Sequence, residues 1–439
     1  VFVSCGSNED TGSKAGSEAE SSSAGTSSAK SEVSTAGSDS EPITIQFWNS
    51  WTGPDGDTLV DIVNNFNQSN PWNITIEMDI NSAFAEKLAT ALPAGESSEL
   101  LLMATGDRFK YQQYLYPMDS IWEDTQLNEE DFLGGYIEAC KIDDKLYSVP
   151  FQNSSMYMYW NKDLFEKAGL DPESPPQSLK EWSEVAAKIT DPSSNTYGSG
   201  LFKSYGNQLM CLMQLSGGMA VTEESDGKYK VNFAGNEGYK EFLTWAKELV
   251  NNEDQPLEDD IDSMFKANQI GVMVNGAWLA PGADDSDVNF GMSKIFGTEP
   301  MGDVAGFFIA DSASDEAKIA CKRFIEWWYM GDGEMELPQT GGGRWALEIG
   351  FPSSYSPLIE TDEYKSNERL QALTVEDPDA VIQISVPTSF YAYSEVTTVI
   401  GEMVQSVLYD TPIDEALDNA QKDVEALVTQ YHGADALAK

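Results

Sequence analysis

Two periodicities of apolar residues run along the chain, and together they predict an α/β protein. Residues 43–47 and 74–78 alternate apolar and polar side chains at every second position, which is typical of β-strands. Residues 57–66, which lie between these two segments, predict a helix. A strand, a helix and a second strand in this order favour a βαβ unit with a parallel sheet.

Three later segments predict amphipathic helices. Residues 178–181 have the S-x-x-E pattern of a capping box, and the residues after them place apolar side chains on one helical face. Residues 239–250 carry a second apolar stripe at helical spacing. Residues 411–414 indicate a third helix, with proline at its first position.

The N-terminal segment differs in composition from the rest of the chain. Residues 6–41 are mostly Ser, Gly, Ala, Glu and Thr and contain no aromatic residue, so they predict a disordered tether. The sequence before them, VFVSCG, is typical of the end of a bacterial lipoprotein signal. We therefore expect a lipid on Cys5, since the sequence has no apolar run of transmembrane length.

The length and the net charge of the chain limit the number of domains and the kinds of partner that we expect. A chain of 439 residues exceeds what one compact core usually supports, so we expect two domains. Its 26 Lys and Arg residues against 73 Asp and Glu residues give a net charge of −47, which repels nucleic-acid phosphates and anionic membranes. We therefore expect no nucleic-acid partner and a membrane contact only through the lipid anchor.

Histidine and cysteine are scarce. The single histidine, His432, argues against most histidine-based catalysis and histidine metal sites. The cysteines other than Cys5 follow no zinc or redox spacing. A disulfide among Cys140, Cys211 and Cys321 and three isolated buried thiols both stay open. We expect neither a metal nor a cofactor.

Three segments give the chain a family resemblance. They are YSVPF and MYWNKDLFEKAGL within residues 147–170, MFKANQIGVMVNGAW in residues 264–278, and TSFYA in residues 388–392, which precedes a TPIDEAL helix. In this order they resemble the carbohydrate-binding proteins of ABC importers, the group typified by maltose-binding protein. Trp160 replaces a usual tyrosine, and Asn268 replaces an expected glycine.

The resemblance implies a periplasmic-binding-protein-like fold, in which two α/β lobes are joined by a hinge around a central ligand cleft. It places chain crossings near residues 149–153 and 304–309. The expected division is residues 1–5 as the signal end and lipidated cysteine, 6–41 as the tether, 42–150 as the first part of lobe 1, 151–303 as lobe 2 with the return to lobe 1, 304–350 as a lobe 1 and hinge segment, and 351–439 as the C-terminal part of lobe 2.

Aromatic residues near strand ends are candidates for holding a sugar. Sugars have apolar faces and a rim of hydroxyls, so a receptor needs flat rings and fixed hydrogen-bonding groups. Trp48, Asn49 and Trp51 follow the first predicted strand, where open α/β sheets bind ligands, although both indoles could instead pack in the core. Trp278 and Tyr391 match stacking positions of the resembled family.

Polar candidates lie at two other predicted strand ends. Asp107 and Arg108 follow the apolar run at 100–103. They are either a surface ion pair or, as the resemblance implies, cleft residues that bind hydroxyls. Asn153 and Ser154 stand at the first crossing, where they either reach the ligand or only bond the strand ends.

A stretch of glycines precedes two further candidates, Arg344 and Trp345. Both could face the ligand from a pocket loop, or they could belong to a turn with a half-buried tryptophan. No Lys-Ser or Lys-Thr pair follows the glycines, which argues against a phosphate loop.

Together these observations favour a binding protein over an enzyme. We expect a monomeric oligosaccharide receptor of an ABC importer, with a membrane permease as its protein partner and no catalytic residue. We expect it at the extracellular face of the cytoplasmic membrane, on a Gram-positive surface rather than in a periplasm. The alternatives are a receptor for a peptide, a polyamine or another small solute, and a surface glycoside hydrolase, for which no catalytic signature is present.

Overall fold

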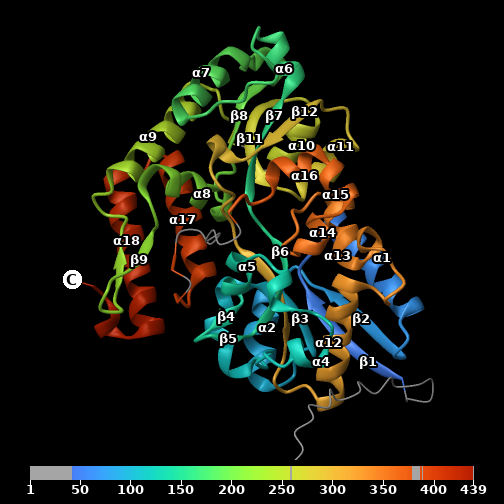
Figure 1. Ribbon diagram of the computed structural model, residues 1–439. Coiled ribbons are helices and arrows are strands. Elements are labelled where there is room, and N and C mark those ends of the chain that lie inside the picture. The colour runs from blue at the N-terminus through green and yellow to red at the C-terminus, as the bar shows by residue number, and fades with distance from the viewer. Residues whose placement is uncertain (1–41, 258–259, 378–385, 388, 439) are drawn as a thin grey trace, which may run out of the picture. The chain divides into compact units, whose positions relative to one another are not determined.

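The computed structural model describes residues 42–257, 260–377, 386–387 and 389–438 (Figure 1). The predictions for Cys5 and for the tether at 6–41 lie outside the described residues. Within the described part, none of the helices combines the length and the apolar character needed to cross a bilayer.

Lobe 1, as named here, is built on a five-stranded sheet with the order β2-β1-β3-β13-β6. Strands β1 and β2 run parallel with α1 between them, which confirms the predicted βαβ unit. Strand β13 is antiparallel to both β3 and β6, so β1, β3 and β6 all end at the same edge. The bounds are β1 (Ile43–Asn49), α1 (Pro54–Ser69), β2 (Ile74–Ile80), β3 (Leu100–Ala104), β6 (Ser148–Asn153) and β13 (Val304–Ile309).

Helices cover both faces of this sheet (Figure 1). Alternate residues of β1, such as Ile45 and Phe47, are fully buried against α1 and α12 (Asp315–Met330). On the other face, Leu101 and Met103 of β3 pack against α2 (Phe84–Ala94). The alternation in the sequence is thus explained by a sheet whose successive side chains enter two different cores.

Lobe 2 has a four-stranded sheet with the order β12-β7-β11-β8. Its central strands are buried at every position, because helices lie over both faces. The bounds are β7 (Met156–Asn161), β8 (Tyr197–Gly200), β11 (Ile270–Gly276) and β12 (Phe290–Ser293), with α7 (Leu179–Ile189), α8 (Gly206–Gly217), α9 (Glu237–Asn251), α17 (Tyr393–Leu408) and α18 (Ile413–His432).

The predicted helices of lobe 2 are present, with small differences at their ends. Ser178 caps α7 by accepting a hydrogen bond from the Glu181 backbone N–H at 3.2 Å. The Glu181 carboxylate reaches one residue further back than a capping box requires and accepts from the Gln177 N–H at 2.8 Å. Helix α18 begins at Ile413, so Pro412 is its N-cap and not its first helical residue.

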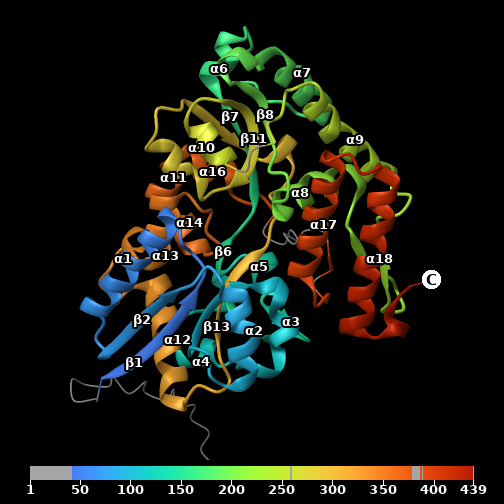
Figure 2. The same ribbon diagram turned by 180° about the vertical axis from the view of Figure 1, so that it is seen from behind.

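The chain passes between the lobes beside β6 and β13, near the predicted crossings. Residue Val304 of β13 pairs with Asn153 of β6, and β6 leads directly into β7 of the other sheet. Figure 2 shows both strands running from the lobe 1 sheet toward lobe 2. After residue 350, α14 (Ser356–Ile359), α15 (Asp362–Ser366) and α16 (Glu368–Leu373) pack in the core that contains Phe47 and extends to Tyr159 of β7.

Short elements complete the described fold. Thr105–Asp107 is a 3₁₀ turn and Trp345–Ile349 a π-helical turn. Further short elements are α3 (Arg108–Tyr111), β4 (Lys141–Ile142), β5 (Lys145–Leu146), α4 (Ile121–Asp124), α5 (Gly134–Ala139), α6 (Lys162–Lys167), β9 (Val221–Glu223), β10 (Tyr229–Val231), α10 (Ile261–Lys266), α11 (Leu279–Asp284) and α13 (Gly341–Arg344).

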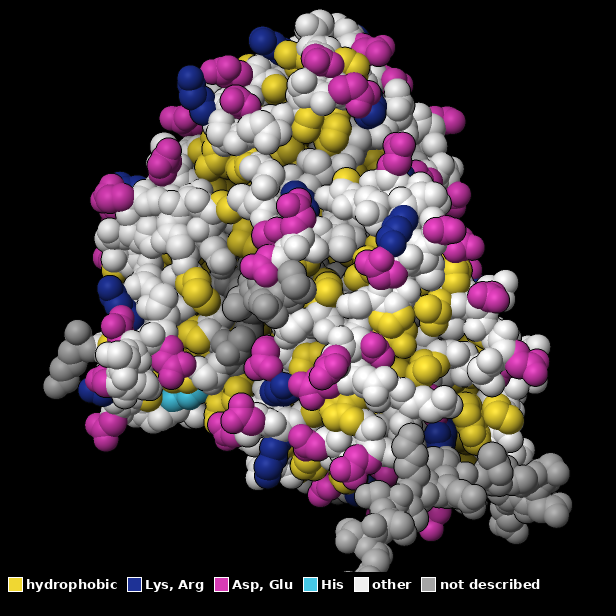
Figure 3. All heavy atoms as spheres, viewed as in Figure 1, with side chains coloured by type: hydrophobic (Ala, Val, Ile, Leu, Met, Phe, Trp, Pro, Cys, Tyr) yellow, Lys and Arg dark blue, Asp and Glu magenta, His cyan; other side chains and the backbone are white. Residues whose placement is uncertain are grey.

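The three cysteines of the described chain are free and buried. The structure therefore settles the open alternative in favour of isolated thiols at Cys140, Cys211 and Cys321. Burial raises the pKa of the Cys140 thiol to about 12, which keeps it protonated and unreactive. At the surface, Asp and Glu side chains are scattered over the whole face seen in Figure 3, as the net charge predicts.

Candidate ligand site between the two lobes

A hollow of about 380 Å³ is lined by residues of both lobes. Its lobe 1 side is the loop that follows β1 together with the start of α1. Its lobe 2 side comes from α10 and from the turn that leads into α11. The lining residues are Ser50, Trp51, Thr52, Gly53, Asp55, Asp262, Lys266, Trp278, Leu279 and Gly282.

Trp51 enters the hollow from lobe 1. Its backbone N–H donates to the Asn49 side chain at 3.0 Å, which fixes the loop to the end of β1. Its ring meets Phe151 of β6 edge-on, with centroids 5.9 Å apart. The indole is only half-buried, so part of its surface stays available to a ligand.

Trp278 enters the same hollow from lobe 2. A Cβ on Gly276 would lie 2.0 Å from the Trp278 ring, so the indole rests directly on the backbone at the end of β11. On its other side, Phe351 lies 6.2 Å away between ring centroids. Only glycine at position 276 permits this approach, which gives the Asn-Gly turn a physical reason.

Charged groups of both signs lie beside the indoles. Asp262 accepts a hydrogen bond from the Asn275 side-chain amide at 2.7 Å, and burial raises its pKa to about 6. The nearby Lys266 ammonium opposes this rise. Burial also raises the pKa of Asp55, although the Gly56 N–H donates to its carboxylate at 3.0 Å. The hollow thus combines flat apolar faces with hydrogen-bond acceptors and donors.

The lobes also touch where the turn after β3 meets the start of α17. The Ser394 hydroxyl donates to the Asp107 carboxylate at 2.6 Å. The Lys110 ammonium pairs with Glu395 at 2.8 Å, with both side chains about a quarter exposed. Next to these contacts, the rings of Phe109 and Tyr391 stack with centroids 5.1 Å apart.

Behind this contact lies a buried carboxyl at the start of β13. The Val304 N–H donates to Asp303 at 2.9 Å, and the Thr105 hydroxyl donates at 3.4 Å. Burial, together with the charge of Asp107, raises the pKa of Asp303 to about 7. The Arg108 guanidinium opposes that rise but is itself buried, with its pKa lowered to about 10 by burial.

Two side-chain amides at the same edge of the sheet have spare donors. Asn49 ends β1 and Asn153 ends β6, and both are fully buried. In the described part of the chain, the Nδ2 atom of each finds no hydrogen-bond acceptor. A buried donor without an acceptor costs about 1–3 kcal/mol. Neither amide lines the hollow.

Comparison with known proteins identifies the family. Residues 61–371, more than half of the chain, match the family model of the bacterial extracellular solute-binding protein. The chain belongs to this family. A binding protein of Brucella abortus (strain 2308) is 24% identical over 426 residues, which cover 90% of this chain and 95% of that protein.

Two further similarities come from a relative and from a solved structure. The sn-glycerol-3-phosphate-binding periplasmic protein UgpB of Salmonella typhimurium is 30% identical over 162 residues, 33% of this chain and 35% of that protein. Maltose-bound MalE3 of T. maritima matches with a TM-score of 0.73 at 19% identity, over 88% of this chain and 100% of that chain. This structural match confirms the predicted fold of two α/β lobes.

The structure of this solute-binding protein brings only some of the predicted site residues together. Trp51 and Trp278 line one hollow, whereas Asp107 and Tyr391 lie at the other contact between the lobes. Asn153 sits at the crossing, where its Oδ1 accepts from the Ser155 hydroxyl at 2.6 Å. Ser154 donates its backbone N–H to the Asp303 carbonyl at 2.7 Å.

Two predicted placements need correction. Strand β1 extends through Asn49, so Trp48 is a strand residue whose ring faces α2, with the Lys87 ammonium 3.3 Å from its centroid. Asp107 and Arg108 do not pair with each other. Arg108 is 1% exposed and donates to the backbone carbonyls of Lys141 and Thr105 at 2.7 and 2.8 Å.

The glycine stretch forms neither a pocket loop nor an open turn. Trp345 is 2% exposed, stacks on Phe351 and donates its Nε1–H to Gln152 at 2.9 Å. Arg344 is held by Glu348 at 2.7 Å. Neither Arg344 nor Trp345 lines the hollow, and their roles in ligand binding stay predictions.

Five polar residues of the hollow were not predicted from the sequence: Ser50, Thr52, Asp55, Asp262 and Lys266. A signal did exist for two of them. Asp262 and Lys266 are four residues apart on a helix, so they face the same side, and that helix opens the segment that resembles the family.

Proposed function

We propose that this solute-binding protein is the receptor of an ABC importer for an oligosaccharide. The observation that carries the proposal is a hollow lined by one indole from each lobe, with carboxylates and an ammonium beside them. A ligand held between two such faces binds the closed arrangement better than an open one and shifts the population toward closure. The closed form then docks on the membrane permease and catalyses no reaction of its own.

Some of the remaining predicted residues take roles in the same cleft. Asn49 and Asn153 offer their spare amide donors to ligand hydroxyls. Asp107 and Tyr391 exchange their present partners in the other lobe for ligand atoms when a ligand enters between the lobes. None of Trp48, Arg108, Ser154, Arg344 and Trp345 lines the hollow, and as ligand contacts they stay predictions.

We propose further that a lipid on Cys5 holds this receptor, as a monomer, at the outer face of the cytoplasmic membrane of a Gram-positive cell. The support is the VFVSCG sequence and the long polar segment after it. Metabolic labelling with a fatty acid tests this, with Cys5→Ser as the variant that loses the label. Unlabelled wild-type protein in the membrane fraction would contradict it.

The ligand class is tested by titration with defined oligosaccharides. Calorimetry and tryptophan fluorescence against β-mannan, xylan and maltodextrin oligomers should give one saturable response. Trp51→Ala and Trp278→Ala should each weaken binding by about tenfold or more, since a stacking ring contributes about 0.5–1.5 kcal/mol beyond its buried area. Trp122→Ala, on another face of lobe 1, is the matched control and should leave the affinity unchanged. No saturable response to any sugar would reject the class.

A cationic solute is the second candidate. The hollow holds two carboxylates, Asp55 and Asp262, against one ammonium, Lys266, and this excess favours a polyamine. The same excess disfavours a phosphate ester such as the ligand named for UgpB, because phosphate sites are built from cations. Saturable binding of spermidine that is lost in Asp262→Asn, without any sugar response, would replace the oligosaccharide with a polyamine.

A further inference from the structure

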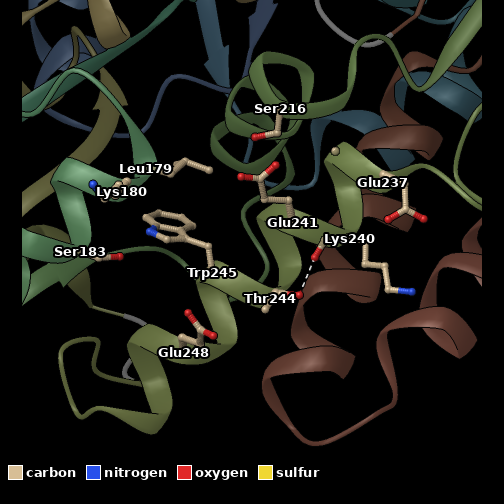
Figure 4. A pocket seen from close by; sticks show the side chains of 11 residues that line it. Leu179, Lys180, Ser183, Ser216, Glu237, Lys240, Glu241, Thr244, Trp245 and Glu248 are labelled. Atoms are coloured by element: carbon tan, nitrogen blue, oxygen red, sulfur yellow. Dashed lines mark hydrogen bonds between the residues drawn. The ribbon is translucent and has the colours of Figure 1, made fainter.

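A second hollow, of about 760 Å³, lies on lobe 2 outside the candidate ligand site. It is a groove between α7, α9 and the C-terminal end of α8 (Figure 4). Helix α9 lines it with Trp245 and with three glutamates, Glu237, Glu241 and Glu248, which are called the α9 carboxylates below. Residues 241, 245 and 248 share one face of the helix because of their spacing.

Trp245 forms the floor of this groove and is 7% exposed. Its ring packs edge-on against Trp182, with centroids 5.4 Å apart. In Figure 4 the ring edge that carries Nε1 is turned toward α7, beside Ser183. No described residue accepts a hydrogen bond from this buried Nε1–H. An acceptor that enters the groove would therefore remove a desolvation cost of about 1–3 kcal/mol.

The rim of the groove is acidic. The α9 carboxylates are exposed, and in the described part of the chain none of them belongs to an ion pair. The two lysines of the lining are already held by acids outside it. Lys180 pairs with Glu184 at 3.5 Å, and Lys240 pairs with Asp414 at 2.7 Å. The three carboxylates thus outnumber the two lysines of the lining, and each lysine is also paired with an acid outside it.

We infer that this groove binds a basic segment of a partner protein. A peptide supplies partners for both features: main-chain carbonyls for the Nε1–H of Trp245, and Lys or Arg side chains for the α9 carboxylates. A polyamine has the cations but no acceptor. A neutral sugar has acceptors but no cation. The inference stands apart from the cleft ligand and does not depend on it.

A blocked peptide of alternating glycine and arginine is a suitable probe, used at about 0.15 M salt, where charges more than about 8 Å apart are screened. Heteronuclear NMR of the full chain follows the indole N–H signal of Trp245, assigned through its loss in Trp245→Phe. The peptide should shift this signal saturably. The double variant Glu241→Gln/Glu248→Gln should weaken binding by about tenfold or more.

The matched control removes two exposed glutamates elsewhere, in Glu402→Gln/Glu415→Gln, on α17 and α18. The affinity of this control variant for the peptide should stay within about twofold of the wild-type affinity. Equal losses in both double variants would mean that the peptide senses only net charge, and would overturn the inference. A Trp245 signal that stays fixed while the peptide binds would overturn it too, as would saturable shifts with spermidine or a sugar and none with the peptide.

Discussion

At the scale of single residues, Asp262 is a partly buried acid that lines the candidate ligand site. Its folded pKa of about 6 lies above the ordinary value of 3.8 because burial disfavours the carboxylate. The folded protein therefore binds the proton more strongly than the unfolded chain. The resulting contribution to stability is fully present below about pH 3.8 and is lost as the pH rises through 6.

Asp262→Asn should therefore flatten part of the pH dependence of stability. Between about pH 5 and pH 7.5 the wild type should lose about 1 kcal/mol more free energy of unfolding than the variant. The amide keeps an oxygen for the Asn275 donor, and Asp303 titrates equally in both proteins. Urea unfolding at several pH values measures the difference. Parallel pH profiles would show that the Asp262 carboxyl is not perturbed.

At the scale of elements, the turn after β11 holds Trp278 from several sides. The Gly276 N–H bonds the Asn275 side-chain oxygen at 2.8 Å, and the Tyr159 hydroxyl donates to the Gly276 carbonyl at 2.7 Å. The Asn275 amide also reaches Asp262. One short turn thus positions both a ring and an acid of the candidate site.

Gly276→Ala should displace the Trp278 ring, because the new Cβ would stand 2.0 Å from it. We expect ligand affinity to fall by about tenfold or more, the loss expected for removing a stacking ring. Gly291→Ala is the matched control, since its Cβ would stand 2.1 Å from the ring of Trp160, which does not line the hollow. Calorimetry with the ligand found in the oligosaccharide screen compares the two. Equal ligand affinities of the two variants would show that the position of the Trp278 ring does not affect binding.

At the scale of the whole molecule, the contacts between α3 and α17 hold the lobes together without a ligand. The Lys110–Glu395 pair is supported by the Tyr431 hydroxyl, which donates to the same carboxylate at 2.8 Å. Partly exposed ion pairs contribute about 0.2–1 kcal/mol. A contribution of that size changes a two-state population by a few-fold, which is enough to set how far the empty receptor closes.

Lys110→Met should therefore open the ligand-free receptor. We expect a larger radius of gyration by X-ray scattering in the absence of ligand, and the wild-type value at saturating ligand. Lys162→Met, which breaks the Lys162–Glu173 pair inside lobe 2 at 2.8 Å, is the control and should change neither value. If Lys110→Met and wild type had the same radius of gyration without ligand, the Lys110–Glu395 pair would not be what holds the lobes together.

Features with a local cause were predictable from the sequence. The βαβ unit, α7 and α9 carry their signals in residues that are neighbours in the chain. The crossings near 149–153 and 304–309 were expected from the family resemblance. The turn that presents Trp278 belongs to the same class, because the glycine and the ring it carries are two positions apart. Asp55 carries no such mark in a chain with 73 acidic residues, and the local signal for Asp262 and Lys266 is only their spacing of four residues on one helix.

The order of neighbouring residues determined the spacing of apolar side chains in each helix and strand and the residues that cap the helices. The composition determined the charge of the surface. Only the tertiary structure decided which residues share a surface. Strand β13 enters the sheet between β3 and β6, and the loop of Trp51 and the turn of Trp278, from two different sheets, line one hollow. The tertiary structure also decided that Trp48 faces α2. Strand β1 runs two residues further than the predicted strand, and the position of a residue in a strand fixes which face its side chain takes. Contacts between distant segments depend on such packing choices, which no short pattern encodes.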